Sequence, residues 1–174
     1  MAKCKVCRAP FDRRSMTHKC CSPECAIEYA RKERENRERK EIAARKLAIK
    51  RRSEWLKDAE AAFNAYIRAR DKDRPCISCG RFHTGSYDAG HYRSVGAAQH
   101  LRFNEDNVHK QCCQCNQHKS GNAIEYRIGL VARIGIERVE RLETNNEIKK
   151  WSIEEAKAIK AEYKAKLKEI IDTQ

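Results

Sequence analysis

A chain of 174 residues is long enough for one ordinary domain or two small ones. Only 40% of it is hydrophobic and 36% is charged, which argues against one large apolar core and favours small metal-stabilised modules joined by solvated helices. The net charge of +13 favours a polyanionic partner. Nucleic acid is the usual one, because lysine and arginine displace the counterions condensed on phosphates. No segment has the roughly 20 consecutive apolar residues that span a bilayer, and no apolar signal segment follows the first residues, so we expect no membrane partner.

Residues 1–25 are expected to form a small zinc module. The chain has ten cysteines, which should be reduced thiols in the absence of a secretion signal. Most of them occur in pairs with two or three residues between them, which favours metal binding over disulfides. A segment this short cannot bury enough surface to fold alone, so the metal must stabilise it. His18 is an alternative ligand and Cys20 is left over; the best four-ligand set is Cys4, Cys7, Cys21 and Cys25.

Residues 26–75 are expected to form a long charged helix and a linker. The segment has no glycine or proline before Pro75 and is rich in strong helix formers. Between Tyr29 and Arg52 acidic and basic residues alternate, which indicates a solvated helix held by i,i+4 ion pairs. It is either a spacer or a basic rod along a nucleic acid backbone. From Trp55 to Ile67 apolar residues recur at helical spacing, so this part should pack on the module that follows.

Residues 76–122 carry the second set of paired cysteines. Four thiolates at this spacing can hold one zinc ion and clip together the ends of the segment between them. Because cysteine fills every position in both sets, we expect two structural zinc ions per chain. Glycines punctuate short extended pieces, which predicts the order knuckle, strand, loop, strand, knuckle and short helix. Cys113 is left over, Phe82, Tyr87 and Tyr92 are the expected core, and the ligands are Cys76, Cys79, Cys112 and Cys115.

Residues 123–174 are expected to be helical. Apolar residues recur at helical spacing from Ile124 to Ile134, and a last helix should begin near Ser152, with Glu155 completing a capping box. These helices should cover the preceding module or form a dimer contact, and the sequence does not choose between the two.

The central module also holds residues suited to phosphodiester hydrolysis. His91 is the expected general base, because an imidazole can take and release a proton near pH 7. Asn107 could orient that imidazole, directly or through a backbone carbonyl. Asn116 offers a hard amide oxygen for Mg²⁺ or Mn²⁺, and Asp88 is the nearest carboxylate for a second ligand.

Each of these residues also has a structural explanation. A histidine near a strand is more often structural than catalytic, Asn107 could form a turn, and Asn116 could only cap a helix. The case for catalysis therefore depends on the four residues occurring together between two cysteine pairs. Asp88 could pair with Arg93 instead of binding a metal. Among the other histidines, His109 and His118 are alternative metal ligands, and His83 and His100 are expected to be surface residues.

Two resemblances follow from these residues. The pattern Asp88-Ala-Gly-His91, then Asn107, then Cys112-x-x-Cys115-Asn116-x-x-Lys119 resembles the HNH, or ββα-metal, nucleases in their HNN variant. Four further strings resemble the NinG (Rap) recombination proteins of lambdoid phages, so the likeness covers nearly the whole chain. They are the Cys-Ser-Pro-Glu-Cys knuckle at 21–25, Leu-Arg-Phe-Asn-Glu at 101–105, Gln-His-Lys-Ser-Gly-Asn at 117–122, and the segment from Trp151 to Tyr163.

The resemblance implies a phage recombination endonuclease of the host cytoplasm that cuts branched DNA such as D-loops and three- or four-way junctions. It also implies a mainly helical α+β fold, in which a zinc-stabilised ββα-metal core is flanked by the amino-terminal zinc knuckle, the long basic helix and the carboxy-terminal helices. A homodimer would suit the paired scissile positions of a junction. Many HNH nucleases place a metal ligand just before the base, where this chain has Gly90, so the second ligand is in doubt. The expected DNA contacts are Arg93, Arg102, Lys110 and Lys119.

Two other functions fit the same residues. A non-catalytic zinc module that binds DNA or an assembly partner would explain the cysteines and the charge, with His91 as a spare residue. A basic protein that binds RNA or a membrane surface would show no preference for branched over linear DNA.

Overall fold

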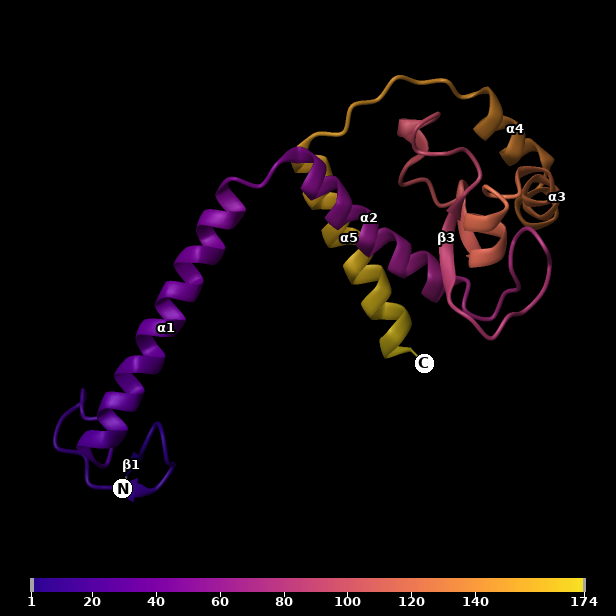
Figure 1. Cartoon of the computed structure of the whole chain (residues 1–174). Coiled ribbons are helices and arrows are strands. Elements are labelled where there is room, and N and C mark those ends of the chain that lie inside the picture. Colours follow the sequence, from indigo (N-terminus) through magenta and orange to yellow (C-terminus); the bar gives the residue numbers. More distant parts are fainter. Residues whose placement is uncertain (1, 174) are drawn as a thin grey trace. The chain divides into compact units, whose positions relative to one another are not determined.

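The computed structural model of the chain describes residues 2–173, which are mainly helical with two small antiparallel sheets. The chain folds into two compact units, one formed by residues 1–50 and the other by residues 51–174 (Figure 1). Among the helices formed by residues 2–173, none is long and apolar enough to cross a lipid bilayer. The chain is therefore a mainly helical α+β protein, as the sequence predicts.

The first unit joins a small hairpin to a long helix. Strands β1 (Ala2–Lys3) and β2 (Pro10–Phe11) pair and precede α1 (Pro23–Ala48). The Ser22 hydroxyl caps α1 by accepting a hydrogen bond from the Cys25 amide at 3.3 Å, and Pro23 occupies the first turn, as predicted. No side chain of α1 is buried, and pairs such as Glu28–Lys32 at 2.6 Å lie along its surface. The predicted solvated helix is confirmed.

Helix α1 ends before the apolar part of the charged segment begins. Residues 49–51 separate it from α2 (Arg52–Arg70), where the Glu54 carboxylate accepts a hydrogen bond from the Arg51 amide. The change from a wholly charged to a half-apolar pattern thus coincides with a break between two helices. Helix α2 buries one face of five side chains, Leu56, Ala59, Ala62, Phe63 and Ile67.

Helices α2 and α5 (Ile153–Asp172) pack side by side (Figure 1) and form the larger core of the second unit. Tyr163 of α5 meets Phe63 edge-on at 4.7 Å between ring centroids. Ser152 and Glu155 form the predicted capping box at the start of α5. Ala89 and Val108 of the central hairpin complete this core, so α2 supports the hairpin as the sequence predicts.

The central hairpin consists of β3 (Tyr87–His91) and β4 (Val108–Cys112), paired from Tyr87↔Cys112 to His91↔Val108. The short 3₁₀ helix η1 (Gln99–Leu101) lies in the loop between them, and the π-helical turn η2 (Gln114–His118) follows β4. The predicted order of knuckle, strand, loop, strand, knuckle and short helix is confirmed. The predicted core is partly wrong, because Phe82 is 68% exposed; the aromatic residues of the larger core belong mainly to α2 and α5.

Helices α3 (Ala123–Ile134) and α4 (Ile136–Thr144) form the second core with the knuckle residue Ile77. Gly135, with φ of +84°, ends α3 and begins α4. Tyr126 and Leu130 are the buried residues of α3, whereas Ile124 and Ile128 are exposed. The apolar spacing therefore identified the helix correctly but did not identify its buried face.

Candidate metal centres and catalytic pocket

The central cysteine clip gathers Cys76, Cys79, Cys112 and Cys115, whose sulfur atoms all lie within 4.8 Å of one another. A tetrahedral zinc ion with Zn–S bonds of about 2.3 Å needs sulfurs about 3.8 Å apart, so the set could hold one ion with modest adjustment. The Cys112 amide also donates to the Cys76 sulfur at 3.3 Å, and the Ile77 amide donates to the Lys110 carbonyl at 3.0 Å. The knuckle is thus attached to β4 by backbone as well as by sulfur.

The amino-terminal cysteine clip gathers the other predicted set, Cys4, Cys7, Cys21 and Cys25, again within 4.8 Å. Cys20 and Cys113 lie outside both sets, as predicted. His18 is not a member either: its Nδ1 atom accepts a hydrogen bond from the Arg14 amide, and its ring packs edge-on against Phe11. Four thiolates leave no coordination position open for water, which suits structural zinc.

His91 stands at the end of β3 and is half-buried. Its Nε2 atom lies 3.2 Å from the carbonyl oxygen of Arg102. Because a carbonyl can only accept a hydrogen bond, this contact favours the tautomer with its proton on Nε2, and the Ala89 carbonyl also interacts with the ring. Burial lowers the pKa of His91 from its usual value, which keeps the imidazole neutral and able to accept a proton at pH 7.

Asn107 is fully buried and does not contact the imidazole through any hydrogen bond of the described residues. Its amide oxygen accepts from the Arg93 amide at 2.8 Å, and its amide nitrogen donates to the carbonyls of Arg93 and Leu101 at 3.0 and 3.3 Å. Its own carbonyl accepts from the Tyr92 amide at 2.8 Å. Asn107 therefore holds the chain that leaves His91 and the segment that presents the Arg102 carbonyl.

Asn116 lies on η2, where its amide nitrogen donates to a carboxylate oxygen of Asp88 at 2.9 Å. The neighbouring Gln117 donates to the same oxygen at 2.8 Å. This arrangement turns the amide oxygen of Asn116 away from Asp88. A carboxylate and an amide oxygen are the hard donors that Mg²⁺ and Mn²⁺ prefer, but here the amide presents its nitrogen to Asp88, so the two oxygens would meet at one ion only if the amide turned over.

Position 90 cannot supply the metal ligand that many HNH nucleases have there. A Cβ atom on Gly90 would lie 2.0 Å from the side-chain oxygen of Gln111, well inside contact distance. Gln111 is itself fully buried and donates to the Ser78 hydroxyl and the Gly121 carbonyl. The absence of a side chain at Gly90 is therefore explained by packing.

A pocket of about 330 Å³ lies beside β3 and is lined by His91 and Asn116 together with Tyr92, Ser94 and Ser120. Successive strand residues point to opposite faces, so Asp88 projects from the face of β3 opposite to that of His91. Asp88 thus contacts Asn116 but does not itself line the described pocket. The structure brings the predicted base and one predicted metal ligand to one cavity.

Of the four predicted DNA contacts, only Lys119 is an exposed side chain. Lys110 is wrong as a surface contact: it is 5% exposed, and its ammonium donates to the Lys72 carbonyl at 2.7 Å. The Arg102 guanidinium pairs with Glu60 at 2.6 Å and is only 17% exposed. The Arg93 guanidinium donates to the carbonyls at the end of α4, including that of Leu142 at 2.8 Å. Both arginines are held by the protein's own acceptors.

The two rival histidines differ in their surroundings. His109 is buried, and burial lowers its pKa to about 3, so it is a neutral core residue that packs near Tyr126. His118 is exposed at the end of η2.

The sequence did not reveal that the Arg102 carbonyl is the hydrogen-bond partner of His91, because a backbone acceptor is present at every residue and leaves no side-chain signal.

Comparison with known proteins gives a consistent result. The family model described as "Bacteriophage Lambda NinG protein" matches residues 1–172. Protein ninG of Escherichia phage lambda is 51% identical over 168 residues, covering 86% of this chain and 82% of its own, and protein ninG of Salmonella phage P22 is 49% identical over 171 residues, covering 88% and 84%. Protein ninG of Escherichia phage 933W is 46% identical over 186 residues, covering 97% and 92%. No solved structure matches the chain.

Proposed function

The chain belongs to the NinG family of lambdoid phage proteins, and on that premise we propose that it is a metal-dependent endonuclease that cuts branched DNA in phage recombination. One observation carries this proposal: His91 and Asn116 line the same pocket, beside the central cysteine clip. The net charge of +13 supports a nucleic acid substrate. The choice of D-loops and three- or four-way junctions rests on the resemblance to the family.

The chemistry assigned to His91 is proton abstraction from the attacking water. The Arg102 carbonyl favours the tautomer with its proton on Nε2, and in that tautomer Nδ1 would take the proton from water. Asn107 acts as a positioning residue, because it ties down the segments on both sides of that contact. Lys119 is exposed three residues after Asn116 and is suited to a phosphate oxygen.

Asp88 and Asn116 would hold the Mg²⁺ or Mn²⁺ ion. The bound ion would stabilise the negative charge that develops on the phosphate and the leaving oxygen. To share an ion with Asp88, the Asn116 amide would have to turn over, because its nitrogen faces the carboxylate in the structure. The two cysteine clips serve a different purpose, since each has its four positions filled by sulfur and anchors the chain around it.

A nicking assay on a labelled four-way junction tests the proposal, with wild-type protein, His91→Ala and the control His100→Ala, each with and without Mg²⁺. Removing a general base costs roughly 100- to 10,000-fold in rate, so His91→Ala should abolish measurable cleavage while retaining junction binding. His100→Ala should cleave like wild type, because the hydrogen bond of the His100 ring within residues 2–173 is to the Asn145 carbonyl, away from the pocket. Cleavage by His91→Ala at close to the wild-type rate would refute the assignment.

A magnesium titration separates the metal ligand from its neighbour. Asn116→Ala should lower the rate and raise the Mg²⁺ concentration needed for half-maximal cleavage, whereas Gln114→Ala, at an exposed η2 position outside the contacts with Asp88, should leave both nearly unchanged. If wild-type protein binds the junction but never cuts it in Mg²⁺ or Mn²⁺, the non-catalytic DNA-binding module becomes the better explanation of the same fold.

A further inference from the structure

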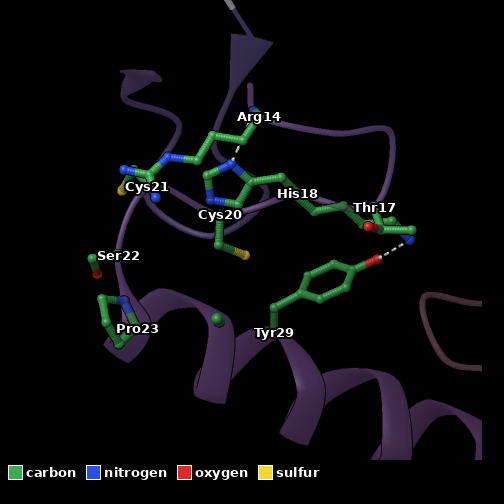
Figure 2. Close-up of a pocket in the computed structure, with 10 residues that line it drawn as sticks. Arg14, Thr17, His18, Cys20, Cys21, Ser22, Pro23 and Tyr29 are labelled. Atoms are coloured by element: carbon green, nitrogen blue, oxygen red, sulfur yellow. Dashed lines mark hydrogen bonds between the residues drawn. The ribbon is translucent and has the colours of Figure 1, made fainter. Parts of the chain in front are cut away.

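The first unit has its own cavity, of about 660 Å³, beside the amino-terminal cysteine clip. Its walls come from the loop between Arg14 and Ser22 and from the first two turns of α1, with Pro23, Ala26 and Tyr29 on the helix side. Figure 2 shows Tyr29 projecting from α1 toward the loop that carries His18 and Cys20. Cavities of roughly 300 to 1,000 Å³ are the usual size for small organic ligands, so one nucleotide fits by volume.

The cavity is electropositive. Arg14 and Lys19 line it, and none of its lining residues is acidic. Residues 1–25 contain six lysines and arginines but two acids, a balance of +4. A zinc ion held by four thiolates carries a charge of about −2, so the module stays positive with its metal bound. An anionic ligand such as a phosphodiester is therefore favoured.

The cavity also offers an aromatic surface, which a simple phosphate site does not need. The Lys19 ammonium lies 5.3 Å from the centroid of the Tyr29 ring and 3.3 Å from its hydroxyl oxygen. The His18 ring is fixed by the Arg14 amide (Figure 2) and packs edge-on against Phe11. An aromatic ring next to cations is the usual composition of a site for single-stranded nucleic acid, where a base stacks and its phosphate meets the charge.

We propose that this cavity, defined by Arg14, His18, Lys19 and Tyr29, binds one unpaired nucleotide of DNA, with the base against Tyr29 and the phosphate at Lys19 and Arg14. In a duplex, pairing and stacking keep the bases out of a concave pocket, so the site selects unpaired strand. The inference rests on the proposed function, since branched DNA is the substrate that presents unpaired nucleotides beside duplex arms. With this site, the amino-terminal module would help to recognise the branch point of the DNA.

The test measures fluorescence anisotropy with full-length, zinc-loaded protein and no added Mg²⁺, using an oligothymidylate of about 12 nucleotides and a duplex of the same length. Tyr29→Leu and Lys19→Gln should each weaken oligothymidylate binding, the first by roughly tenfold, because the variant loses the aromatic face on which the base stacks. Duplex binding should change less than twofold. The matched controls are Ile27→Ala and Lys46→Gln, which change exposed α1 residues outside the cavity.

Zinc content and circular dichroism of each variant show that the module is still folded, and Lys19→Gln guards against a packing defect because Lys19 is exposed. Ultraviolet cross-linking of 5-iododeoxyuridine in the oligomer should attach to the peptide containing Tyr29. Unchanged oligothymidylate affinity in both folded variants, or a cross-link confined to other peptides, would overturn the proposal. Since this binding is read without cleavage, it is independent of the junction assay: a wild-type protein that never nicks would refute the nuclease but not the pocket.

Discussion

Gly129 offers a direct test of how α3 is seated on the cysteine knuckle. It lies in the middle of a 12-residue helix, where alanine normally stabilises by about 1 kcal/mol relative to glycine. In this structure a Cβ atom at position 129 would lie 1.9 Å from the Ile77 carbonyl oxygen. Helix propensity and packing therefore predict opposite signs for Gly129→Ala.

The packing effect should be the larger. The atom in the way is backbone, and the Ile77 amide is hydrogen-bonded to the Lys110 carbonyl between two cysteine ligands, so the knuckle cannot withdraw. Overpacking of this kind costs up to about 3 kcal/mol. Subtracting the propensity gain of about 1 kcal/mol leaves a net loss of about 2 kcal/mol. For a chain of this length that corresponds to a fall in Tm of roughly 4–8 °C.

Tryptophan fluorescence during thermal unfolding measures the effect, because Trp55 and Trp151 are the only tryptophans and both belong to the second unit. Gly96→Ala is the matched control, since a Cβ atom there meets nothing within 4 Å and the residue does not need a positive φ. Its Tm should stay the same or rise slightly. A rise in Tm for Gly129→Ala as well would show that α3 does not press on Ile77 and would refute the reasoning.

Three further results are expected. Cys112→Ser should lower the zinc content from about two ions to about one, whereas Cys113→Ser should leave it unchanged; equal loss from both would contradict the assigned ligand set. Because the folded-state pKa of His109 is about 3, protonation near pH 6.5 favours the unfolded chain, and stability should fall between pH 6.5 and 3 by at most about 1.4 kcal/mol per pH unit. A His109→Gln variant should show a shallower decline in urea midpoint over that range, and identical slopes would argue against burial. Asn107→Ala leaves several buried backbone groups without partners and should cost about 3 kcal/mol in urea unfolding; a loss below about 1 kcal/mol would show that water replaces the amide.

Local signals in the sequence identified the features that depend on neighbouring residues. The cysteine spacing gave both four-sulfur sets, and the capping residues gave the starts of α1 and α5. The order of knuckles and strands also followed from glycine and cysteine positions. These succeed because a knuckle, a cap or a turn is determined within a few residues of chain.

The sequence was less informative wherever a residue's role depends on distant parts of the chain. Lys110 looks like any basic residue until β4 is placed against the end of α2, where its ammonium meets the Lys72 carbonyl. Ile124 and Ile128 share the helical apolar spacing of α3 but face outward. Phe82 is exposed, whereas the rings that fill the larger core come mainly from α2 and α5, far away in sequence.

The pairing of His91 with Asn116 shows the same division. By itself, the sequence determined that an imidazole and an amide lie between two metal-binding cysteine pairs, because those residue types and spacings are local. Only the tertiary structure decided that both line one pocket, that the Arg102 carbonyl favours one tautomer of His91, and that Gln111 closes position 90 to a ligand. The physical reason is that contacts across a hairpin and its loops depend on how whole elements pack, and that packing involves residues far apart in the sequence.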